Sequence, residues 1–114
     1  MLVVHPVPEL PIDPQGCAVV LVLRQAACGA ALLRSVVDRE RRQALAAEER
    51  AIAGLPRVAA LDFVDHLCDA TTCSPVRDGL LMLRDSRHLS VAGALTLTEE
   101  LEAAILAHAR RRDL

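Results

Sequence analysis

The feature that most constrains the fold of this chain is a long helical pattern that stands between two short apolar runs. From about residue 30 to residue 53, apolar side chains recur at near-helical spacing and a charged run, 38–42, occupies the opposite face. The apolar run 2–5 precedes this pattern and ends at Pro6, and the run 58–61 follows it. Both runs have the length and composition of buried strands. The order strand, helix, strand predicts an α/β fold. The apolar face of the helix comprises Leu33, Val37, Ala44, Leu45, Ile52 and Leu55.

The rest of the chain gives weaker signals. Four prolines and a glycine between residues 6 and 16 predict an irregular loop, whereas the apolar run 18–23 fits a strand or a buried helix equally well. Residues 62–85 read as a loose region. Ser90 is a suitable cap for a last helix. The apolar stripe of that helix comprises Ala94, Leu97, Leu101, Ile105 and His108.

Length and composition exclude several classes of protein. The chain has 114 residues, 53% of them apolar, which suits one domain with a core and does not suit a disordered tail. The formal net charge of −2 is unlike that of a nucleic-acid-binding protein, and the basic run 110–112 reads as a solvated last helical turn. No apolar run reaches the roughly 20 residues that a membrane span needs, and no signal peptide is visible.

One short stretch near the C-terminus has the residue types of acid–base chemistry. Asp85 stands three residues before His88, at the predicted entry to the last helix. A carboxylate at this spacing can bind imidazole Nδ1 and fix its tautomer, which leaves Nε2 free to take a proton from a serine hydroxyl. The pair alone is a weak signal because an Asp and a His at this spacing arise often by chance. The longer string that runs from Asp85 through His88-Leu89-Ser90 to Gly93-Ala94 is much more specific.

That string resembles the last catalytic block of the SGNH hydrolases, and in particular the SGNH domain fused to membrane acyltransferases of the acyltransferase-three type. The resemblance is strong over residues 61–94 and weaker before them, where Pro6-Val7-Pro8-Glu9 and two cysteines contribute. It implies a three-layer, flavodoxin-like α/β fold with a parallel sheet and helices on both faces. Residues 1–114 would be one C-terminal portion of such a domain, incomplete at the N-terminus, with its catalytic block at 84–94.

The resemblance also implies roles for single residues. Asp85 would be the orienting acid and His88 the general base, while Ser90 would be a structural cap. Gly93 and Ala94 would let the last helix pack closely on the sheet.

The sequence departs from the family pattern at the nucleophile. The family carries its serine in a Gly-Asp-Ser motif near the start of the domain, and this sequence has no such triplet. The preceding blocks that supply an oxyanion-hole Gly and Asn are also absent, and Leu83 stands where an aromatic residue is usual. The alternative is therefore a catalytically inactive domain with a binding role or none. The four serines of the chain are Ser35, Ser74, Ser86 and Ser90.

The implied chemistry is acyl transfer through a serine ester. The resemblance to the acyltransferase-fused group implies acetyl transfer to cell-envelope glycans, so that the partners are an acyl donor, a glycan and a membrane acyltransferase region of the full-length protein. It implies a periplasmic or extracytoplasmic location, tethered to the inner membrane through a region absent from this chain. No cofactor, metal or nucleic acid is implied.

The four cysteines, Cys17, Cys28, Cys68 and Cys73, allow three disulfide connectivities. The resemblance favours the local pairs Cys17–Cys28 and Cys68–Cys73, which would fit an oxidising compartment. Two alternatives are a zinc site that uses Cys68, Cys73 and His66, and reduced, buried thiols.

The remaining histidines have no chemical partner in the sequence pattern. His5 reads as a packed or partly exposed residue, His66 as part of a solvated loop, and His108 as a cation near the C-terminal end of the last helix.

Overall fold

The computed structural model describes residues 1–12, 29 and 31–112. Strand β1 (Leu2–Val4) pairs in parallel with strand β3 (Ala59–Leu61), and helix α2 (Arg34–Ile52) lies between them in the chain. The predicted strand–helix–strand unit is therefore present. Helix α2 ends where glycine and proline follow, and Gly54 adopts the left-handed backbone conformation with a φ of +77°.

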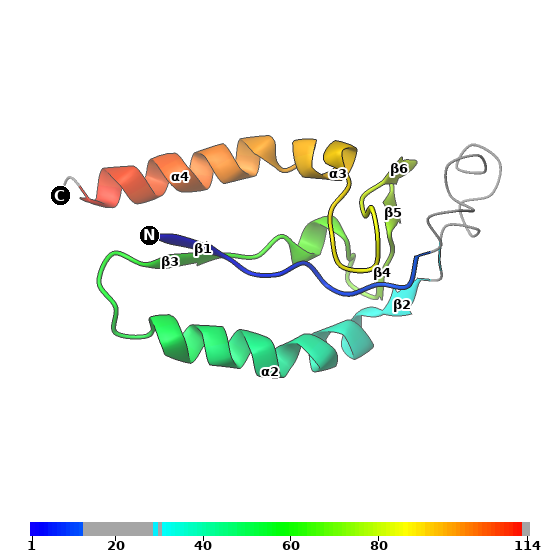
Figure 1. Ribbon diagram of the computed structural model, residues 1–114, viewed down its shortest axis with the longest axis horizontal. Helices are drawn as coiled ribbons and strands as arrows, with labels where there is room; N and C mark the ends of the chain where they lie inside the picture. The colour runs from blue at the N-terminus through cyan, green and yellow to red at the C-terminus, as the bar shows by residue number, and fades with distance from the viewer. Residues whose placement is uncertain (13–28, 30, 113–114) are drawn as a thin grey trace.

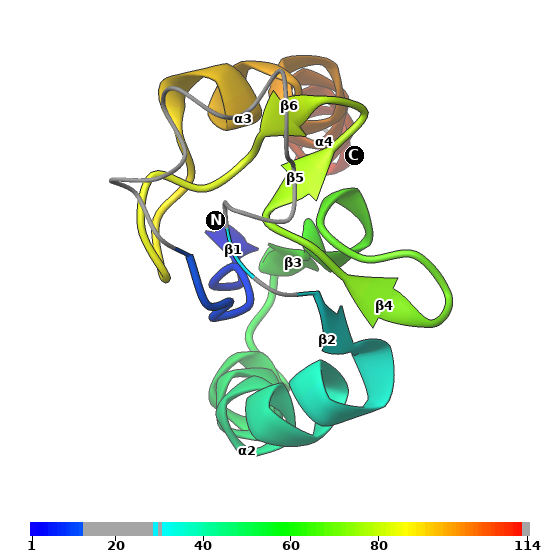
Figure 2. The ribbon, with the colours of Figure 1, turned by 90° about the vertical axis from the view of Figure 1, so that its right-hand side faces the viewer.

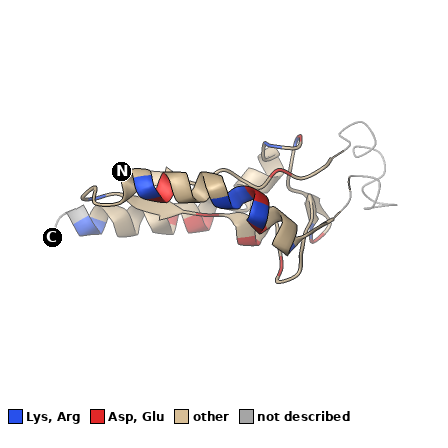
Figure 3. Ribbon diagram, turned by 90° about the horizontal axis from the view of Figure 1, so that it is seen from below, with Lys and Arg blue, Asp and Glu red and all other residues tan. Residues whose placement is uncertain are grey.

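The parallel pair lies between two helices. Figure 1 shows α2 on one side of β1 and β3, and helix α4 (Thr98–Arg112) on the other. Charged residues of both signs follow the outer side of α2 in Figure 3, as the charge run predicted. The described part of the chain is thus a small mixed α/β structure. Its only parallel sheet has two strands, so the three-layer parallel sheet remains an expectation.

The core lies beyond the carboxyl ends of the two parallel strands and not around them. No residue of β1 or β3 is fully buried, and Val4 is 46% exposed. The buried cluster instead joins the segment after β1, the start of α2 and two segments that follow β3, residues 64–73 and 82–83. Its members are Leu10, Val37, Val64, Leu67, Cys68, Cys73, Met82 and Leu83.

The region 62–85 is more ordered than the sequence indicated. It contains a short 3₁₀ helix η2 (Val64–His66) and strand β4 (Thr72–Cys73), which pairs with strand β2 (Leu32–Leu33). A second antiparallel pair follows, made by β5 (Val76–Arg77) and β6 (Leu80–Leu81). Each of these strands has two residues, too few to show the alternation by which a strand is recognised.

The last helix is not continuous. It is divided into α3 (Val91–Leu95) and α4 by a tight turn at Thr96. The Gly93 carbonyl accepts both the Thr96 N–H, at 3.2 Å, and Thr96 Oγ1, at 2.7 Å, whereas the Leu97 N–H donates to the Ala94 carbonyl. The predicted apolar stripe is partly wrong: Leu97 is buried and Leu101 half-buried, but Ala94 and Ile105 are exposed. The prediction for the apolar face of α2 is likewise partly wrong. Val37 is its buried residue, whereas Leu33 and Leu55 are 60% and 50% exposed.

Candidate active site

The loop that carries Asp85 and His88 is closed by backbone hydrogen bonds. Leu83 and Leu89 form an antiparallel bridge, and the Arg84 N–H donates to the His88 carbonyl at 2.8 Å. Leu83 is completely buried and forms part of the core. The loop is therefore anchored in the core through Leu83, and the polar side chains that it carries are exposed.

Within this loop the Asp85 carboxylate turns back on the chain that follows it. Its Oδ1 accepts the N–H of Arg87 at 2.9 Å and the N–H of His88 at 2.8 Å. Both carboxylate oxygens lie 2.9 Å from Nδ1 of the His88 ring. These bonds, first the one from the Arg87 N–H and then those from His88, lower the pKa of Asp85 to about 2. Asp85 is therefore ionised at neutral pH and orients the imidazole.

The other ring nitrogen of His88 is available. The side chain is 64% exposed, and none of the described residues forms a hydrogen bond with Nε2. The geometry is that of a carboxylate–imidazole pair on an exposed loop, an arrangement that fits acid–base chemistry. Ser86 lies within the same loop, and Ser90 is fully engaged as a cap. The described residues thus bring Asp85 and His88 together and place no serine hydroxyl in hydrogen-bond contact with Nε2.

The loop is fixed at the end of the molecule where both parallel strands finish. The Leu10 N–H donates to the Ser86 carbonyl at 3.1 Å, and Arg87 lies 3.3 Å from the carboxylate of Glu9. Residues 6–12 continue directly from β1, so these contacts tie the loop to the carboxyl end of β1. Figure 2, which looks from that end, shows the loop on the same side of the sheet as β1. The carboxyl ends of parallel strands are where α/β proteins place their active sites.

The far side of the loop is held by Ser90 and Gly93. Ser90 Oγ donates to the Leu81 carbonyl at 2.6 Å and accepts the Gly93 N–H at 2.8 Å, so the predicted capping role is confirmed. A Cβ on Gly93 would lie 2.3 Å from the Met82 carbonyl oxygen. Gly93 therefore allows the close packing that was predicted, against the backbone at Met82. The exposed Ala94 makes no such approach.

One predicted disulfide is present, and for its two cysteines it overturns both the zinc site and the reduced, buried thiols. Cys68 and Cys73 are bonded to each other, so neither is a thiolate ligand or a reduced buried thiol. The zinc site with Cys68, Cys73 and His66 is therefore wrong. No group of three or more metal-binding side chains occurs among the described residues. Cys17 and Cys28 lie outside the described residues, as does the apolar run 18–23.

Three histidines have partners that the sequence did not reveal. The buried His5 contacts Glu48 of α2, and His66 contacts Glu100 of α4. His108 Nε2 lies 2.9 Å from the N-terminal amine. Each partner lies at least 34 residues away in the chain, which local patterns do not detect.

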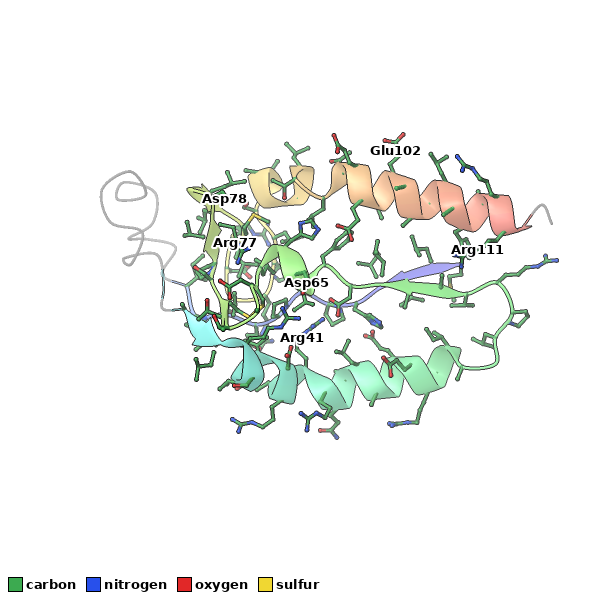
Figure 4. All side chains as sticks on the ribbon, turned by 180° about the vertical axis from the view of Figure 1, so that it is seen from behind. Arg41, Asp65, Arg77, Asp78, Glu102 and Arg111 are labelled. Carbon is green, nitrogen blue, oxygen red and sulfur yellow. A yellow bond between two sulfur atoms is a disulfide. The ribbon has the colours of Figure 1, made fainter. Side chains whose placement is uncertain are left out.

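A second polar site lies on the opposite face. Arg77 and Asp78, which Figure 4 places together near β5 and β6, border a groove of about 300 Å³ together with Asp65 and His66. Neither Asp85 nor His88 lines this groove. Of this set only His66 was considered from the sequence as a candidate site residue. The Arg-Asp-Gly turn, in which Asp78 has a φ of +51°, is the signal that could have drawn attention to it.

Comparison with known proteins gives one family match. The family model described as "SGNH domain (fused to AT3 domains)" matches residues 1–103. No curated protein and no solved structure matches the chain significantly. Within the described residues, no helix is long and apolar enough to cross a membrane.

Proposed function

Because the chain belongs to the family of SGNH domains fused to AT3 domains, we propose that it supplies the acid and the base of a serine-dependent acyltransferase. Asp85 is the orienting acid and His88 the general base. The observation that carries the proposal is the ionised Asp85 carboxylate on Nδ1 of His88, with Nε2 of the same ring open to solvent. The nucleophilic serine belongs to a segment outside this chain.

In the first half of the reaction, Nε2 of His88 takes the proton of the serine hydroxyl as its oxygen attacks the acyl carbonyl. The resulting imidazolium is stabilised by Asp85 and returns the proton to the leaving group, which yields the acyl-serine ester. In the second half, Nε2 takes a proton from the acceptor hydroxyl, whose oxygen attacks the ester carbonyl, and the imidazolium then gives this proton to the departing serine oxygen. Asp85 remains ionised throughout, consistent with its pKa of about 2.

The fusion to AT3 domains suggests a membrane acyltransferase region in the full-length protein. We infer that this region delivers the acyl group and that the acceptor is a hydroxyl of a cell-envelope glycan. The site would then work in the periplasm or another extracytoplasmic compartment. The Cys68–Cys73 disulfide supports an oxidising location.

The test is acyl transfer by the full-length protein to a glycan acceptor. His88→Ala and Asp85→Asn should each lower kcat by a factor of about 10³ or more, since the triad acts as a unit. The control is His66→Gln, which removes the imidazole of another His–carboxylate pair, on the opposite face. Full activity of His88→Ala would refute the proposal and favour a domain without catalytic function.

A further inference from the structure

We propose that one end of the molecule binds the surface of an anionic lipid bilayer. This end, the cationic end, comprises residues 50–60, which include the turn between α2 and β3, and residues 103–112, the last turns of α4. It lies at the amino ends of the parallel strands, whereas the loop with Asp85 and His88 lies beyond their carboxyl ends. The proposal therefore concerns a surface outside the candidate active site and does not depend on the proposed function.

The first observation is the segregation of charge along the chain. The whole chain has a formal net charge of −2, yet residues 50–60 and 103–112 contain five arginines and no aspartate or glutamate. Asp113, which follows them, lies outside the described residues. In Figure 3 the basic residues of α4 lie at its C-terminal end, and its glutamates lie nearer its start. The two segments meet, because Arg57 and Arg111 border the same pocket of about 250 Å³.

The second observation is that the arginines of this end lack carboxylate partners. Arg50, Arg57 and Arg111 form no ion pair with a described residue, whereas the two arginines of the loop with His88 each lie beside a carboxylate. The dipole of α4 favours cations in its last turn, which accounts for Arg110 and Arg111 without a ligand. It does not account for Arg57, which precedes β3 and borders the same pocket. Two unpaired arginines that meet at one pocket fit a phosphate group.

The third observation is an apolar tip between the arginines. All residues from 53 to 57 are exposed, and Leu55 exposes 50% of its surface beside Pro56. Arg57 adopts a φ of +63°, which is uncommon for a residue with a side chain, and its carbonyl accepts a hydrogen bond from the Met1 nitrogen at 2.7 Å. The turn is thus held in a conformation that leaves Leu55 exposed. Segments that insert at the level of the lipid headgroups combine exposed apolar residues with arginines in this way.

These features fit a bilayer better than another macromolecule. A stable protein interface buries roughly 800 Å² on each partner, whereas this end offers an exposed turn whose apolar side chain is Leu55. Binding of single-stranded nucleic acid uses aromatic rings for stacking, and Phe63, the one aromatic residue of the chain, is buried and lies outside the cationic end. Lipid headgroups supply many phosphates to a set of arginines, and the boundary of the acyl chains accepts Leu55. The contact would fix the orientation of the molecule on the membrane.

The experiment is flotation of the 114-residue chain with lipid vesicles. The anionic probe contains equal parts of phosphatidylglycerol and phosphatidylcholine, and the neutral probe is phosphatidylcholine alone. We expect the chain to bind the anionic vesicles at least about tenfold more tightly than the neutral ones. Added salt should weaken this binding, because it screens exposed charges.

A double variant tests the arginines. Arg57→Asn with Arg111→Gln removes two charges, and asparagine suits the positive φ of residue 57. The matched control, Arg39→Asn with Arg42→Gln, removes two exposed arginines of α2 that also form no ion pair with a described residue. The first pair should weaken binding to the anionic vesicles roughly 30-fold, and the control pair less than about threefold.

A second pair of variants tests the apolar tip without a change of charge. Leu55→Ser removes the apolar side chain from the turn, and Val91→Ser removes one from α3 that is 81% exposed and lies outside the cationic end. Leu55→Ser should weaken binding at least about fivefold, and Val91→Ser should not change it. All the substituted residues are exposed, so the circular dichroism spectra of the variants should match that of the parent chain.

No binding to the anionic vesicles, equal binding to the neutral ones, or equal effects of a variant and its matched control would overturn the proposal. So would inorganic phosphate that shifts the NMR signals of Arg57 and Arg111 while the vesicles fail to bind the chain, because the pocket would then be a site for a small anion. None of these measurements involves the candidate active site, so their outcome leaves the test of acyl transfer unaffected.

Discussion

Replacement of Gly93 by alanine tests how the loop with Asp85 and His88 is held. The added Cβ would lie 2.3 Å from the Met82 carbonyl oxygen and 2.9 Å from its carbonyl carbon and Cα. Ordinary contact begins at 3.4 Å. All three neighbouring atoms belong to the backbone, so no side-chain rotation relieves the clash. Helix α3 must move away from Met82.

The magnitude follows from what that movement disturbs. Overpacking of this kind costs about 1–3 kcal/mol. The displaced helix also weakens the bonds from Ser90 to the Met82 and Leu81 carbonyls, at 2.8 and 2.6 Å, worth about 1 kcal/mol each. Alanine has a higher helix propensity than glycine, which offsets about 1 kcal/mol of this loss. We therefore expect the free energy of unfolding to fall by about 2–4 kcal/mol, at least roughly a 30-fold change in the unfolding constant.

The assay is urea unfolding followed by circular dichroism. The control is Ala92→Leu, which adds more volume to the same helix at an exposed position and should change stability by less than about 0.5 kcal/mol. The NMR signals of His88 should shift in Gly93→Ala and not in the control. A Gly93→Ala variant as stable as the parent chain, with unchanged His88 signals, would refute the packing described for α3.

Three further predictions concern the elements around the site. Replacement of both Cys68 and Cys73 by alanine should lower the free energy of unfolding by at least about 2 kcal/mol, since the disulfide closes a short loop in the unfolded chain; alkylation of either thiol without prior reduction would contradict it. Ser90→Ala should cost about 1–2 kcal/mol through the lost cap, and no change in the urea midpoint would disprove the cap. The low pKa of Asp85 means that its stabilising effect is complete above the unfolded-state value of about 4 and is lost as pH falls towards about 2. An NMR titration of the Asp85 carboxyl carbon with a midpoint near 4 would contradict its hydrogen bonds.

The strand–helix–strand order could be predicted because its signals are local. The helix α2 is long enough to show its period, and Gly54 marks its end. The apolar runs before and after it are long enough to read as β1 and β3. The two-residue strands could not be predicted, because they are defined by partners and not by their own pattern. The break before α4 is a tight turn at Thr96, whose N–H and Oγ1 both donate to the Gly93 carbonyl, and the apolar pattern of the sequence does not show it.

The candidate site could be predicted because its chemistry lies within one loop. Asp85 and His88 are three residues apart, so the turn that joins them is encoded locally. The contacts that position the loop come from elsewhere. Leu10 contacts Ser86 and Glu9 contacts Arg87, and each pair is separated by more than 70 residues in the chain. No periodic pattern in the sequence indicates such contacts.

The most direct test of the central claim is covalent labelling of the full-length protein with a serine-directed fluorophosphonate. The account predicts labelling of a serine outside this chain, which is lost in His88→Ala and retained in His66→Gln. Asp85, with a pKa of about 2, should leave no inflection between pH 4 and 8. Labelling that is unchanged in His88→Ala, or no labelling at all, would contradict the assignment of Asp85 and His88 as the acid and base.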